Sequence, residues 1–392
     1  MSSKKSMKWP KINLGGLDEE MKIPTSLRGL VALLEDRNID EYNVRMTPEE
    51  LRQKVKMTPK AAYTVVVGRE IVKRIMDGKD PRIIIEAGPC SIDDVKAAYE
   101  FAKRLKRLSD KVDDVFFIMM RAYFEKPRTN IGWRGLIEDP RMDGSDKVDL
   151  GFELARKLLR RINELGLPTI TEYLHTETPQ YIGDFISRGV IGARTVTSCN
   201  HRKMMSGISC PGGFKNTVDG QISPAVDAVR VAGMKNTFRG EDYKGRKAKI
   251  HTRGNEYVNI NLRGGAGPNL NPESIDEALA LLDKHGLRRN IEIDCSHGNS
   301  SKDYRRQMGN LSYVMDQRRG GRSEIFAAMI EAYLMDGSYS DNDIALPYPI
   351  REDTPRIFGL SKTDGCVGFD AFESGVMLEY EKFKQAGWPR VK

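Results

Sequence analysis

The sequence predicts an α/β fold, a (β/α)8 TIM barrel with an N-terminal helical extension and an inserted hairpin before strand six. From about residue 80 onward, short apolar runs alternate with amphipathic stretches, which is the pattern of parallel strands joined by helices. Eight such units in about 260 residues match the size of a closed barrel. An open, doubly wound sheet is the structural alternative, but no Gly-x-Gly-x-x-Gly motif follows the first strand.

Residues 1–80 lie outside this rhythm and are predicted to form an N-terminal arm, with the barrel at 81–392. Ser26–Glu35 and Ala61–Met76 are expected to be amphipathic helices, and Gly78 closes the second one. Such an arm would cap the closed end of the barrel, contact another subunit or bind a regulator. The residues do not choose among these roles.

The barrel strands are predicted from short apolar runs bounded by turn residues. The eight runs are Arg82–Ala87, Val115–Met120, Pro168–Tyr173, Val190–Arg194, Gly213–Asn216, Val258–Arg263, Ile291–Cys295 and Ile325–Ile330. The helices expected between them are Asp93–Leu108, Asp149–Leu165, Pro179–Arg188, Ala225–Ala232, Pro272–His285 and Lys302–Gln317. A polar insert at 235–255 is expected to form the hairpin, and residues 336–363 form a second irregular stretch.

The composition indicates a globular protein rather than a disordered one, because 39% of the 392 residues are hydrophobic and 30% are charged. No apolar run is long enough to span a bilayer, and the N-terminus lacks the apolar core of a secretory signal. The five cysteines are widely spaced, which favours a reducing, cytoplasmic location. The net charge of +8 is spread along the chain without a nucleic-acid-binding motif, so small anionic ligands explain it more simply.

Cations follow the ends of several predicted strands. The segment 121–129, Arg-Ala-Tyr-Phe-Glu-Lys-Pro-Arg-Thr, places three of them directly after an apolar run. Alone, it is as well explained by a solvated basic loop. In a barrel, however, the carboxyl ends of the strands converge on one mouth. The cations expected there are Arg121, Lys126, Arg128, Arg194, Lys215 and Arg263. Their mutual repulsion implies ligands that carry phosphate.

A second set of strand-end residues offers ligands for a metal. Cys90, His297, Glu331 and Asp364 combine a thiolate, an imidazole and two carboxylates, which suit Mn, Fe, Co or Zn better than Mg or Ca. Taken singly, each has an ordinary explanation, because buried cysteines pack as small apolar residues and histidines serve as ordinary polar residues. Their joint placement at the barrel mouth favours one divalent transition metal as a cofactor.

Eight motifs, collinear and similarly spaced, resemble those of type I 3-deoxy-D-arabino-heptulosonate-7-phosphate (DAHP) synthase. The motifs are Gly-Pro-Cys-Ser-Ile (88–92), Arg-Ala-Tyr-Phe-Glu-Lys-Pro-Arg-Thr (121–129), Gly-Trp-Arg-Gly-Leu (132–136), Ile-Gly-Ala-Arg-Thr (191–195), Ser-Cys-Pro-Gly-Gly-Phe-Lys-Asn (209–216), Leu-Arg-Gly-Gly (262–265), Asp-Cys-Ser-His-Gly-Asn-Ser-Ser-Lys (294–302) and Thr-Asp-Gly-Cys (363–366). Enzymes of this family open the shikimate pathway. The resemblance implies condensation of phosphoenolpyruvate with erythrose 4-phosphate to give DAHP and phosphate.

The resemblance also implies a role for each site residue. Cys90, His297, Glu331 and Asp364 match the metal ligands. The residues that match the phosphoenolpyruvate site are Arg121, Lys126, Glu172, Arg194, Lys215 and Arg263. Arg128 and Thr129 match the grip on the phosphate of the aldehyde. Cys90, Lys126 and His297 are the expected catalytic residues, and the proton donor is either Lys126 or a metal-bound water. Family members are commonly dimers or tetramers, so a homodimer or homotetramer is expected.

Three departures from the family separate this chain from an ordinary member. The hairpin, which helps to form a feedback site for an aromatic amino acid in the family, is here rich in charge over residues 238–250. The stretch Pro347–Ile357 lengthens the loop before Asp364, and Gly298 replaces the usual alanine. These changes favour an alternative: a paralogue that joins phosphoenolpyruvate to a different aldehyde in specialised metabolism. A non-catalytic binding protein is a third hypothesis, against which the complete set of metal ligands stands. Cys366 is expected to approach Cys90.

Overall fold

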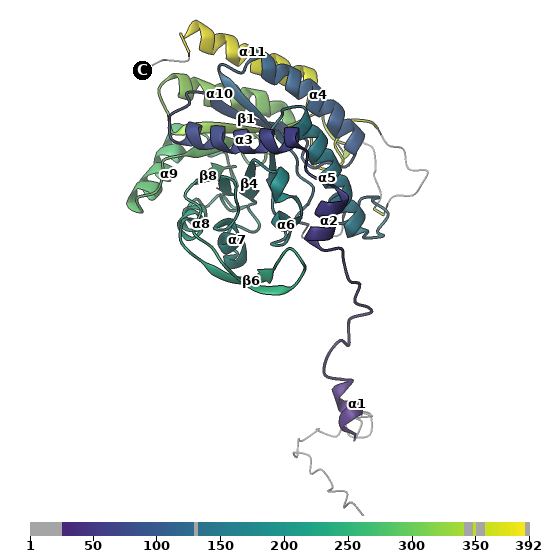
Figure 1. Ribbon diagram of the computed structural model, residues 1–392. Coiled ribbons are helices and arrows are strands. Elements are labelled where there is room, and N and C mark those ends of the chain that lie inside the picture. Colours follow the sequence, from purple (N-terminus) through teal and green to yellow (C-terminus); the bar gives the residue numbers. More distant parts are fainter. Residues whose placement is uncertain (1–25, 129–131, 341–347, 350–356, 389–392) are drawn as a thin grey trace, which may run out of the picture. The chain divides into compact units, whose positions relative to one another are not determined.

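The computed structural model (Figure 1) describes residues 26–128, 132–340, 348–349 and 357–388. The chain divides into two compact units, Met1–Arg45 and Met46–Lys392. In the described part of the first unit, helix α1 spans Leu27–Val31, and the Ser26 hydroxyl accepts a hydrogen bond from the Gly29 amide at 3.1 Å. The prediction of a helix as far as Glu35 is therefore wrong. None of the side chains of α1 is buried, and so short a helix does not extend itself without tertiary packing.

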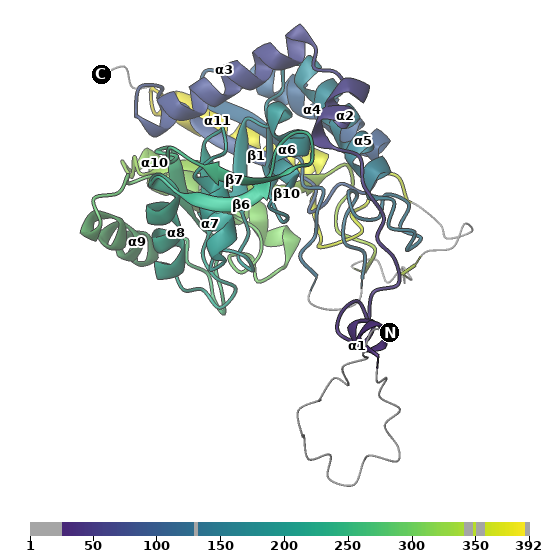
Figure 2. The same ribbon diagram turned by 60° about the horizontal axis from the view of Figure 1, so that its bottom comes forward.

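Eight parallel strands of the second unit close into a barrel (Figure 2), which confirms the predicted fold. The strands are β1 (Ile83–Gly88), β2 (Phe116–Arg121), β3 (Thr169–Glu172), β4 (Arg188–Ile191), β5 (Gly212–Lys215), β8 (Val258–Leu262), β9 (Ile291–Asp294) and β10 (Ile325–Tyr333). Strand β1 pairs with β2 on one side and with β10 on the other, so the sheet has no open edge at this point. The open-sheet alternative is thereby excluded.

Helices cover the outside of the barrel (Figures 1 and 2). They are α2 (Pro48–Lys54), α3 (Pro59–Met76), α4 (Val95–Lys111), α5 (Val148–Glu164), α6 (Thr178–Ile182), α7 (Cys199–Met205), α8 (Ser223–Gly233), α9 (Pro272–Lys284), α10 (Gln307–Arg319) and α11 (Phe369–Gln385), with 3-10 turns at Gly183–Phe185 and Tyr304–Arg306. A short strand β11 (Val367–Gly368) pairs parallel with the end of β10. Helix α3 packs on α5, where the Thr64 hydroxyl donates to the Asn163 carbonyl at 2.8 Å.

The strands form where continuous apolar runs can be buried on both faces. Every residue of β1, β2 and β10 is buried, as expected for parallel strands between a packed interior and covering helices. Several helices begin at polar caps. Thr47 and Glu50 form a capping box at the start of α2, and Asp94 accepts the first free amides of α4.

The predicted hairpin is confirmed. Strands β6 (Thr237–Glu241) and β7 (Lys247–His251) pair antiparallel between α8 and β8, with Phe238 opposite Ile250. Its charged residues alternate with half-buried apolar ones, so one face of the hairpin is apolar in spite of its high charge. No helix in the described ranges has both the length and the apolar character needed to cross a membrane.

Other element boundaries differ from the predictions. The helix expected over Pro179–Arg188 ends at Ile182 and continues only as a 3-10 turn to Phe185, and strand four begins at Arg188 instead of Val190. Arg194 therefore lies beyond the strand in which it was predicted. The helix expected to begin at Lys302 begins at Gln307, because Ser301 and Lys302 adopt positive φ values of 54° and 62°. Helices α2, α7 and α11 were not predicted.

Arg188 explains the misplaced start of strand four. A basic residue before an apolar run reads as the exposed end of a helix, but Arg188 is fully buried inside the barrel. Its guanidinium contacts the Glu86 carboxylate, lies 2.6 Å from Glu292 Oε2 and donates to Asn259 Oδ1 at 2.8 Å. Burial raises the pKa of Glu86 well above its usual value. The charge of Arg188 opposes this effect, and the charge of Glu292 adds to it. These partners come from β1, β8 and β9, so only the closed barrel reveals them.

Replacing Arg188 with alanine is expected to lower the free energy of unfolding by about 3–5 kcal/mol, because Glu86 and Glu292 would remain buried without their shared cation. Urea denaturation measures this loss. The matched control is Arg246→Ala, which removes an exposed pair with Asp242 in the hairpin and should leave the stability essentially unchanged. Equal losses in the two variants would contradict this account.

Candidate active site

The predicted site residues gather at the carboxyl end of the barrel strands. Arg121 ends β2, Lys215 ends β5, and Glu331 lies near the end of β10. Cys90 follows β1 and His297 follows β9. Residues 210 positions apart thus come into contact, as in the buried pair of Arg121 and Glu331 at 2.7 Å.

Three of the four predicted metal ligands form one tight group. The ligand atoms of Cys90, Glu331 and Asp364 all lie within 4.8 Å of one another, and Cys90 Sγ is 3.3 Å from Asp364 Oδ2. His297 stands slightly apart, with Nε2 3.7 Å from Glu331 Oε1. Cys366 approaches Cys90 as expected, since its sulfur accepts a hydrogen bond from the Cys90 amide at 3.3 Å.

His297 is held by groups that the sequence did not single out. Its Nδ1 lies 2.8 Å from Asp294 Oδ2 and 2.7 Å from the Ser296 hydroxyl, which leaves Nε2 facing Glu331. A carboxylate on one ring nitrogen commonly orients the other toward a metal. The backbone of His297 has φ of 51°, a strained value for a residue with a side chain, which the surrounding loop maintains. Asp294 was visible within the Asp-Cys-Ser-His motif, and the signal that marks it is its position three residues before the histidine.

These residues fit a divalent transition metal. A thiol, an imidazole and two carboxylates provide mixed soft and hard donors, and Asp294 supplies the outer carboxylate that such histidines usually have. A small cavity of about 20 Å³, lined by His297, Glu331 and Asp364 among others, adjoins the group. Asp364 lies on its solvent-exposed side, so the group is accessible from outside.

Lys126 is a cation that contacts this group of potential metal ligands. Its Nζ lies 2.9 Å from Cys90 Sγ. Burial alone would lower the pKa of the Lys126 ammonium, but the neighbouring Cys90, Asp364 and Glu331 raise it overall, so the side chain carries its proton. Burial, followed by the charge of Glu331, raises the pKa of the Cys90 thiol to about 12. Lys126 is therefore a proton-carrying group at the reactive end of the barrel.

The other cations divide into paired and unpaired ones. Lys215 donates to Asp294 Oδ2 at 2.7 Å, and burial of that carboxyl is outweighed by His297 and Lys215, which lower its pKa well below the usual value. Arg263 is 8% exposed, and burial, together with the charge of Arg194, lowers the pKa of its guanidinium. Arg194 is exposed. Arg263 donates only to backbone carbonyls in the described contacts, so its charge, together with that of Arg194, is suited to an anion.

The remaining predicted residues lie at the edge of this arrangement. Glu172 ends β3 half-buried against Gly192, where an added Cβ would stand 2.1 Å from its carboxylate oxygen. Arg128 is exposed, and its Nε donates to the Trp133 carbonyl at 3.0 Å rather than to another predicted site residue. Thr129 lies outside the described residues.

Glycines bring the loops of the barrel mouth into backbone contact. A Cβ at Gly298 would lie 2.6 Å from the Gly265 nitrogen, and one at Gly265 would lie 2.4 Å from Gly220. A Cβ at Gly264, which has φ of 73°, would lie 2.5 Å from the Asn299 nitrogen. The glycine that replaces the family's alanine at 298 is therefore required by the packing of this chain.

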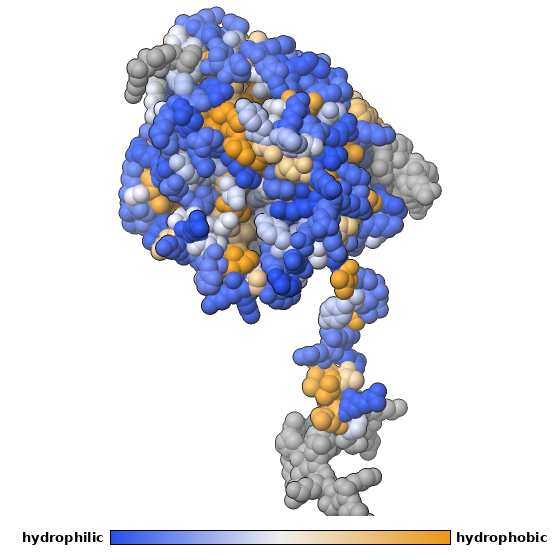
Figure 3. Space-filling view, viewed as in Figure 1, coloured by the Kyte–Doolittle hydropathy of each residue, from blue (hydrophilic) through white to orange (hydrophobic). Residues whose placement is uncertain are grey.

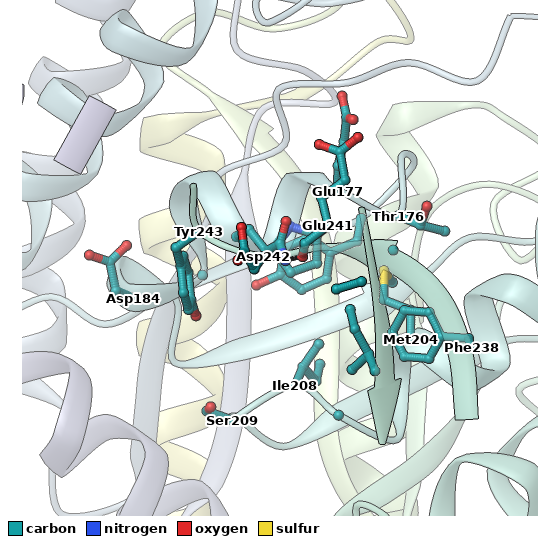
Figure 4. Close-up of a pocket in the computed structure, with 18 of the residues that line it drawn as sticks. Thr176, Glu177, Asp184, Met204, Ile208, Ser209, Phe238, Glu241, Asp242 and Tyr243 are labelled. Carbon is teal, nitrogen blue, oxygen red and sulfur yellow. Dashed lines mark hydrogen bonds between the residues drawn. The ribbon is translucent and has the colours of Figure 1, made fainter. Parts of the chain in front are cut away.

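A much larger cavity, of about 700 Å³, lies between the hairpin and helices α6 and α7. Its lining is mixed, with the apolar and aromatic residues Met204, Ile208, Phe238, Tyr243 and Ile250, the cations Arg52, Arg69, Arg239 and Lys247, and the acids Glu177, Asp184, Glu241 and Asp242. Figure 4 shows Phe238 and Met204 on one side of the pocket and Tyr243 with Asp184 on the other. We call this cavity the hairpin pocket. Sequence reasoning identified the hairpin but not the pocket behind it.

Glu125 is a buried carboxyl that the sequence reasoning passed over. It precedes Lys126, is 2% exposed, and accepts hydrogen bonds from the Leu174 amide at 3.2 Å and the Thr178 hydroxyl at 2.9 Å. Glu138 and His175 also face it, with ligand atoms within 4.8 Å. Burial, only partly offset by these two hydrogen bonds, raises the pKa of Glu125 to about 8.

Comparisons with known proteins agree with the geometry. The family model described as the DAHP synthetase I family matches residues 53–355. The chain is 40% identical over 340 residues to the Tyr-sensitive phospho-2-dehydro-3-deoxyheptonate aldolase of Escherichia coli K12, covering 86% of this chain and 92% of that protein. It is 42% identical over 336 residues to the Phe-sensitive enzyme of the same organism, covering 86% and 93%. The structure of a phospho-2-dehydro-3-deoxyheptonate aldolase from Francisella tularensis matches with a TM-score of 0.83 and 38% identity, over 88% of this chain and 99% of that one.

The raised pKa of Glu125 predicts a specific dependence of stability on pH. Because the folded protein binds this proton more tightly than the unfolded chain, the stabilising contribution of Glu125 is fully present below the usual value of 4.5 and is lost as the pH rises toward about 8. The contribution is roughly 1 kcal/mol per pH unit in this window. Glu125→Gln should flatten that part of the curve of unfolding free energy against pH, as measured by urea denaturation. An identical curve for wild type and variant would rule out this assignment.

Proposed function

The chain belongs to the DAHP synthetase I family and is an enzyme of aromatic biosynthesis, and we propose that it condenses phosphoenolpyruvate with erythrose 4-phosphate. The proposed products are DAHP and inorganic phosphate, and the reaction is proposed to depend on a divalent transition metal. The observation that carries the proposal is the meeting, in one barrel mouth, of the group around Cys90 with the basic side chains of Arg121, Lys126 and Lys215.

The basic residues suit phosphoenolpyruvate, which carries a carboxylate and a phosphate. Arg263 and Arg194 present forked donors without an internal carboxylate partner to satisfy them in the described contacts, so an anion would relieve their repulsion. Arg121 and Lys215 are already held by Glu331 and Asp294, which fixes their positions before substrate arrives. Arg128 and Thr129 are proposed to hold the phosphate of the aldehyde.

In the proposed reaction, C3 of phosphoenolpyruvate forms a bond to the aldehyde carbon, water adds to C2, and phosphate leaves with the bridging oxygen. When bound by Cys90, His297, Glu331 and Asp364, the metal would supply a Lewis acid for the aldehyde oxygen. Lys126 holds a proton within reach of this group and is proposed to deliver it to the oxygen that forms the new hydroxyl. The surrounding arginines stabilise the charge that develops on the departing phosphate.

A different aldehyde acceptor is the second candidate. The loop that departs from the family lies before Asp364, and within it the described Tyr348 donates from its hydroxyl to Asp139 Oδ2 at 3.2 Å. This contact holds Tyr348 against the connection between β2 and α5, and the stretch that contains it is proposed to shape the end that holds the acceptor. The phosphoenolpyruvate half of the proposal is the same in both cases.

The hairpin pocket is proposed to bind an amino-acid effector. Aromatic and aliphatic side chains beside charges of both signs suit an apolar amino acid, whose ammonium and carboxylate need opposite partners. Three relatives are named Tyr-sensitive, Phe-sensitive and Trp-sensitive, which supports a regulatory ligand of this class. The charge of the hairpin does not remove the apolar wall, because Phe238 and Ile250 line the pocket.

A homodimer or homotetramer is also proposed. Tyr63 and Val66 are 71% and 64% exposed on the outer side of α3. Figure 3 shows apolar surface in the region that α3 occupies in Figure 1. An exposed apolar face on a barrel helix supports contact with another copy. The five cysteines are all free, which supports the proposed cytoplasmic location.

The proposed reaction is tested with purified protein, phosphoenolpyruvate, Mn²⁺ and a panel of aldehydes that includes erythrose 4-phosphate. Phosphate should appear in step with the phosphoenolpyruvate consumed, fastest with erythrose 4-phosphate. Chelation should abolish the activity and Mn²⁺ should restore it, whereas Asp364→Ala should not be restored by the same concentration. Absence of phosphate release with every acceptor, beside an active control enzyme, would refute the proposal. A faster reaction with another aldehyde would select the second candidate.

The effector is tested by adding phenylalanine, tyrosine or tryptophan to the active enzyme. At least one is expected to inhibit, and Phe238→Ala should weaken that inhibition by about tenfold or more, the loss of a buried aromatic contact. Lys249→Ala is the matched control, because Lys249 lies on the same hairpin but does not line the pocket. Full activity in the presence of all three amino acids would count against this use of the pocket.

A further inference from the structure

We propose that Glu125 is a positioning residue that couples the wall of the hairpin pocket to the phosphoenolpyruvate-binding segment. The proposal rests on the proposed function, since it assigns regulation to that same site. It begins from the place of Glu125 in the chain, between Arg121, which ends β2, and Lys126, which contacts Cys90. The side chain of Glu125 contacts the connection that follows β3.

Both hydrogen-bond partners of Glu125 belong to that connection. The Leu174 amide lies two residues after Glu172, the last residue of β3, and the Thr178 hydroxyl belongs to the first residue of α6. A single buried carboxyl thus bridges the two ends of the connection between β3 and α6. Displacing the connection would break a hydrogen bond inside the protein, where the loss is costly.

The other side of the same connection forms a wall of the hairpin pocket. Tyr173, Thr176, Glu177, Pro179 and Gln180 all line it, and Figure 4 places Thr176 and Glu177 at the pocket. The Gln180 amide donates to the Glu241 carbonyl of the hairpin. The connection is therefore in contact with the hairpin on one side and with Glu125 on the other.

The backbone that joins Glu125 to the site residues Arg121 and Lys126 is also held by hydrogen bonds. The Lys126 amide donates to the Arg134 carbonyl at 2.9 Å, and the Thr171 hydroxyl donates to the Ala122 carbonyl at 2.7 Å. Because Glu125 lies in the same short backbone segment as Arg121 and Lys126, a displacement of Glu125 would be passed along that segment to both residues. An occupied pocket and an occupied phosphoenolpyruvate site would then favour particular positions of one shared element.

The charge surroundings define the conservative replacement. Glu138, Glu172 and His175 face Glu125, and no guanidinium or ammonium is among the hydrogen-bond partners of its carboxyl in the described chain. Burial is the main cause of the raised pKa of Glu125, about 8, which favours the neutral acid. In Glu125→Gln the amide oxygen can accept from the Leu174 amide and the amide nitrogen can donate to the Thr178 hydroxyl, so most of the coupling should be preserved. Glu125→Ala should remove it.

The test measures hydrogen exchange of the full, metal-loaded chain with and without phosphoenolpyruvate. In wild type, phosphoenolpyruvate should slow exchange of the Leu174 amide by about fivefold or more, the lower range of ordinary coupling. The effect should persist in Glu125→Gln and disappear in Glu125→Ala, with KM for phosphoenolpyruvate raised more than kcat is lowered. Thr178→Val, which removes only one hydrogen-bond donor, serves as a second variant if the alanine protein does not fold, and should reduce the effect.

The control for general destabilisation is Glu379→Ala, since Glu379 is a buried carboxyl that pairs with Arg319 on the far helices α10 and α11. It should lower stability without altering the response of Leu174. An undiminished response in both Glu125→Ala and Thr178→Val would overturn the coupling. So would a loss of activity in Glu125→Ala that glutamine does not rescue. If the segment 121–128 of wild type shows no protection by phosphoenolpyruvate, the proposed function fails; protection there without a response at Leu174 defeats only the coupling.

Discussion

One buried carboxylate, Asp294, organises the catalytic end of this barrel. It sits at the end of β9, accepts the Lys215 ammonium at 2.7 Å and faces Nδ1 of His297 at 2.8 Å. A charge buried without partners would be costly, and here Lys215 at the end of β5 and His297 in the loop after β9 offset that cost together. Neither the lysine nor the imidazole is free to turn away without leaving Asp294 uncompensated. Because Lys215 and His297 share Asp294, this carboxylate orients both side chains, and the other site residues are arranged around them.

The cations of the barrel mouth therefore serve two purposes. Those with an internal partner, such as Arg121 with Glu331, are part of the framework and would keep their place in an empty site. Arg263 and its neighbour Arg194 form no ion pair in the described part of the chain, although the charge of Asp294 partly opposes the effect of burial on Arg263. The proposed substrate, phosphoenolpyruvate, carries anionic groups that would meet this remaining charge.

Much of this arrangement could be predicted from the sequence, because apolar runs and the turn residues around them carry local information. The closed barrel, the inserted hairpin and the approach of Cys366 to Cys90 are confirmed. The failures have one physical origin in contacts between distant residues. Arg188 reads as a surface residue until Glu86 and Glu292 surround it, and the hairpin pocket exists only once the hairpin lies against α6 and α7. Periodicity also left α11 undetected, beyond a stretch dominated by turns.

The glycines of the mouth have a consequence for how this chain can change over generations. Gly220, Gly265 and Gly298 belong to loops after three different strands, yet the backbone of each loop occupies the space where a neighbour's side chain would begin. A residue with a side chain can therefore replace any one of these glycines only if the neighbouring loop moves away. A lineage that carries alanine at 298 must hold its loops slightly farther apart. Change at this end of the barrel is therefore limited by the spacing of these loops as well as by the residues that they display.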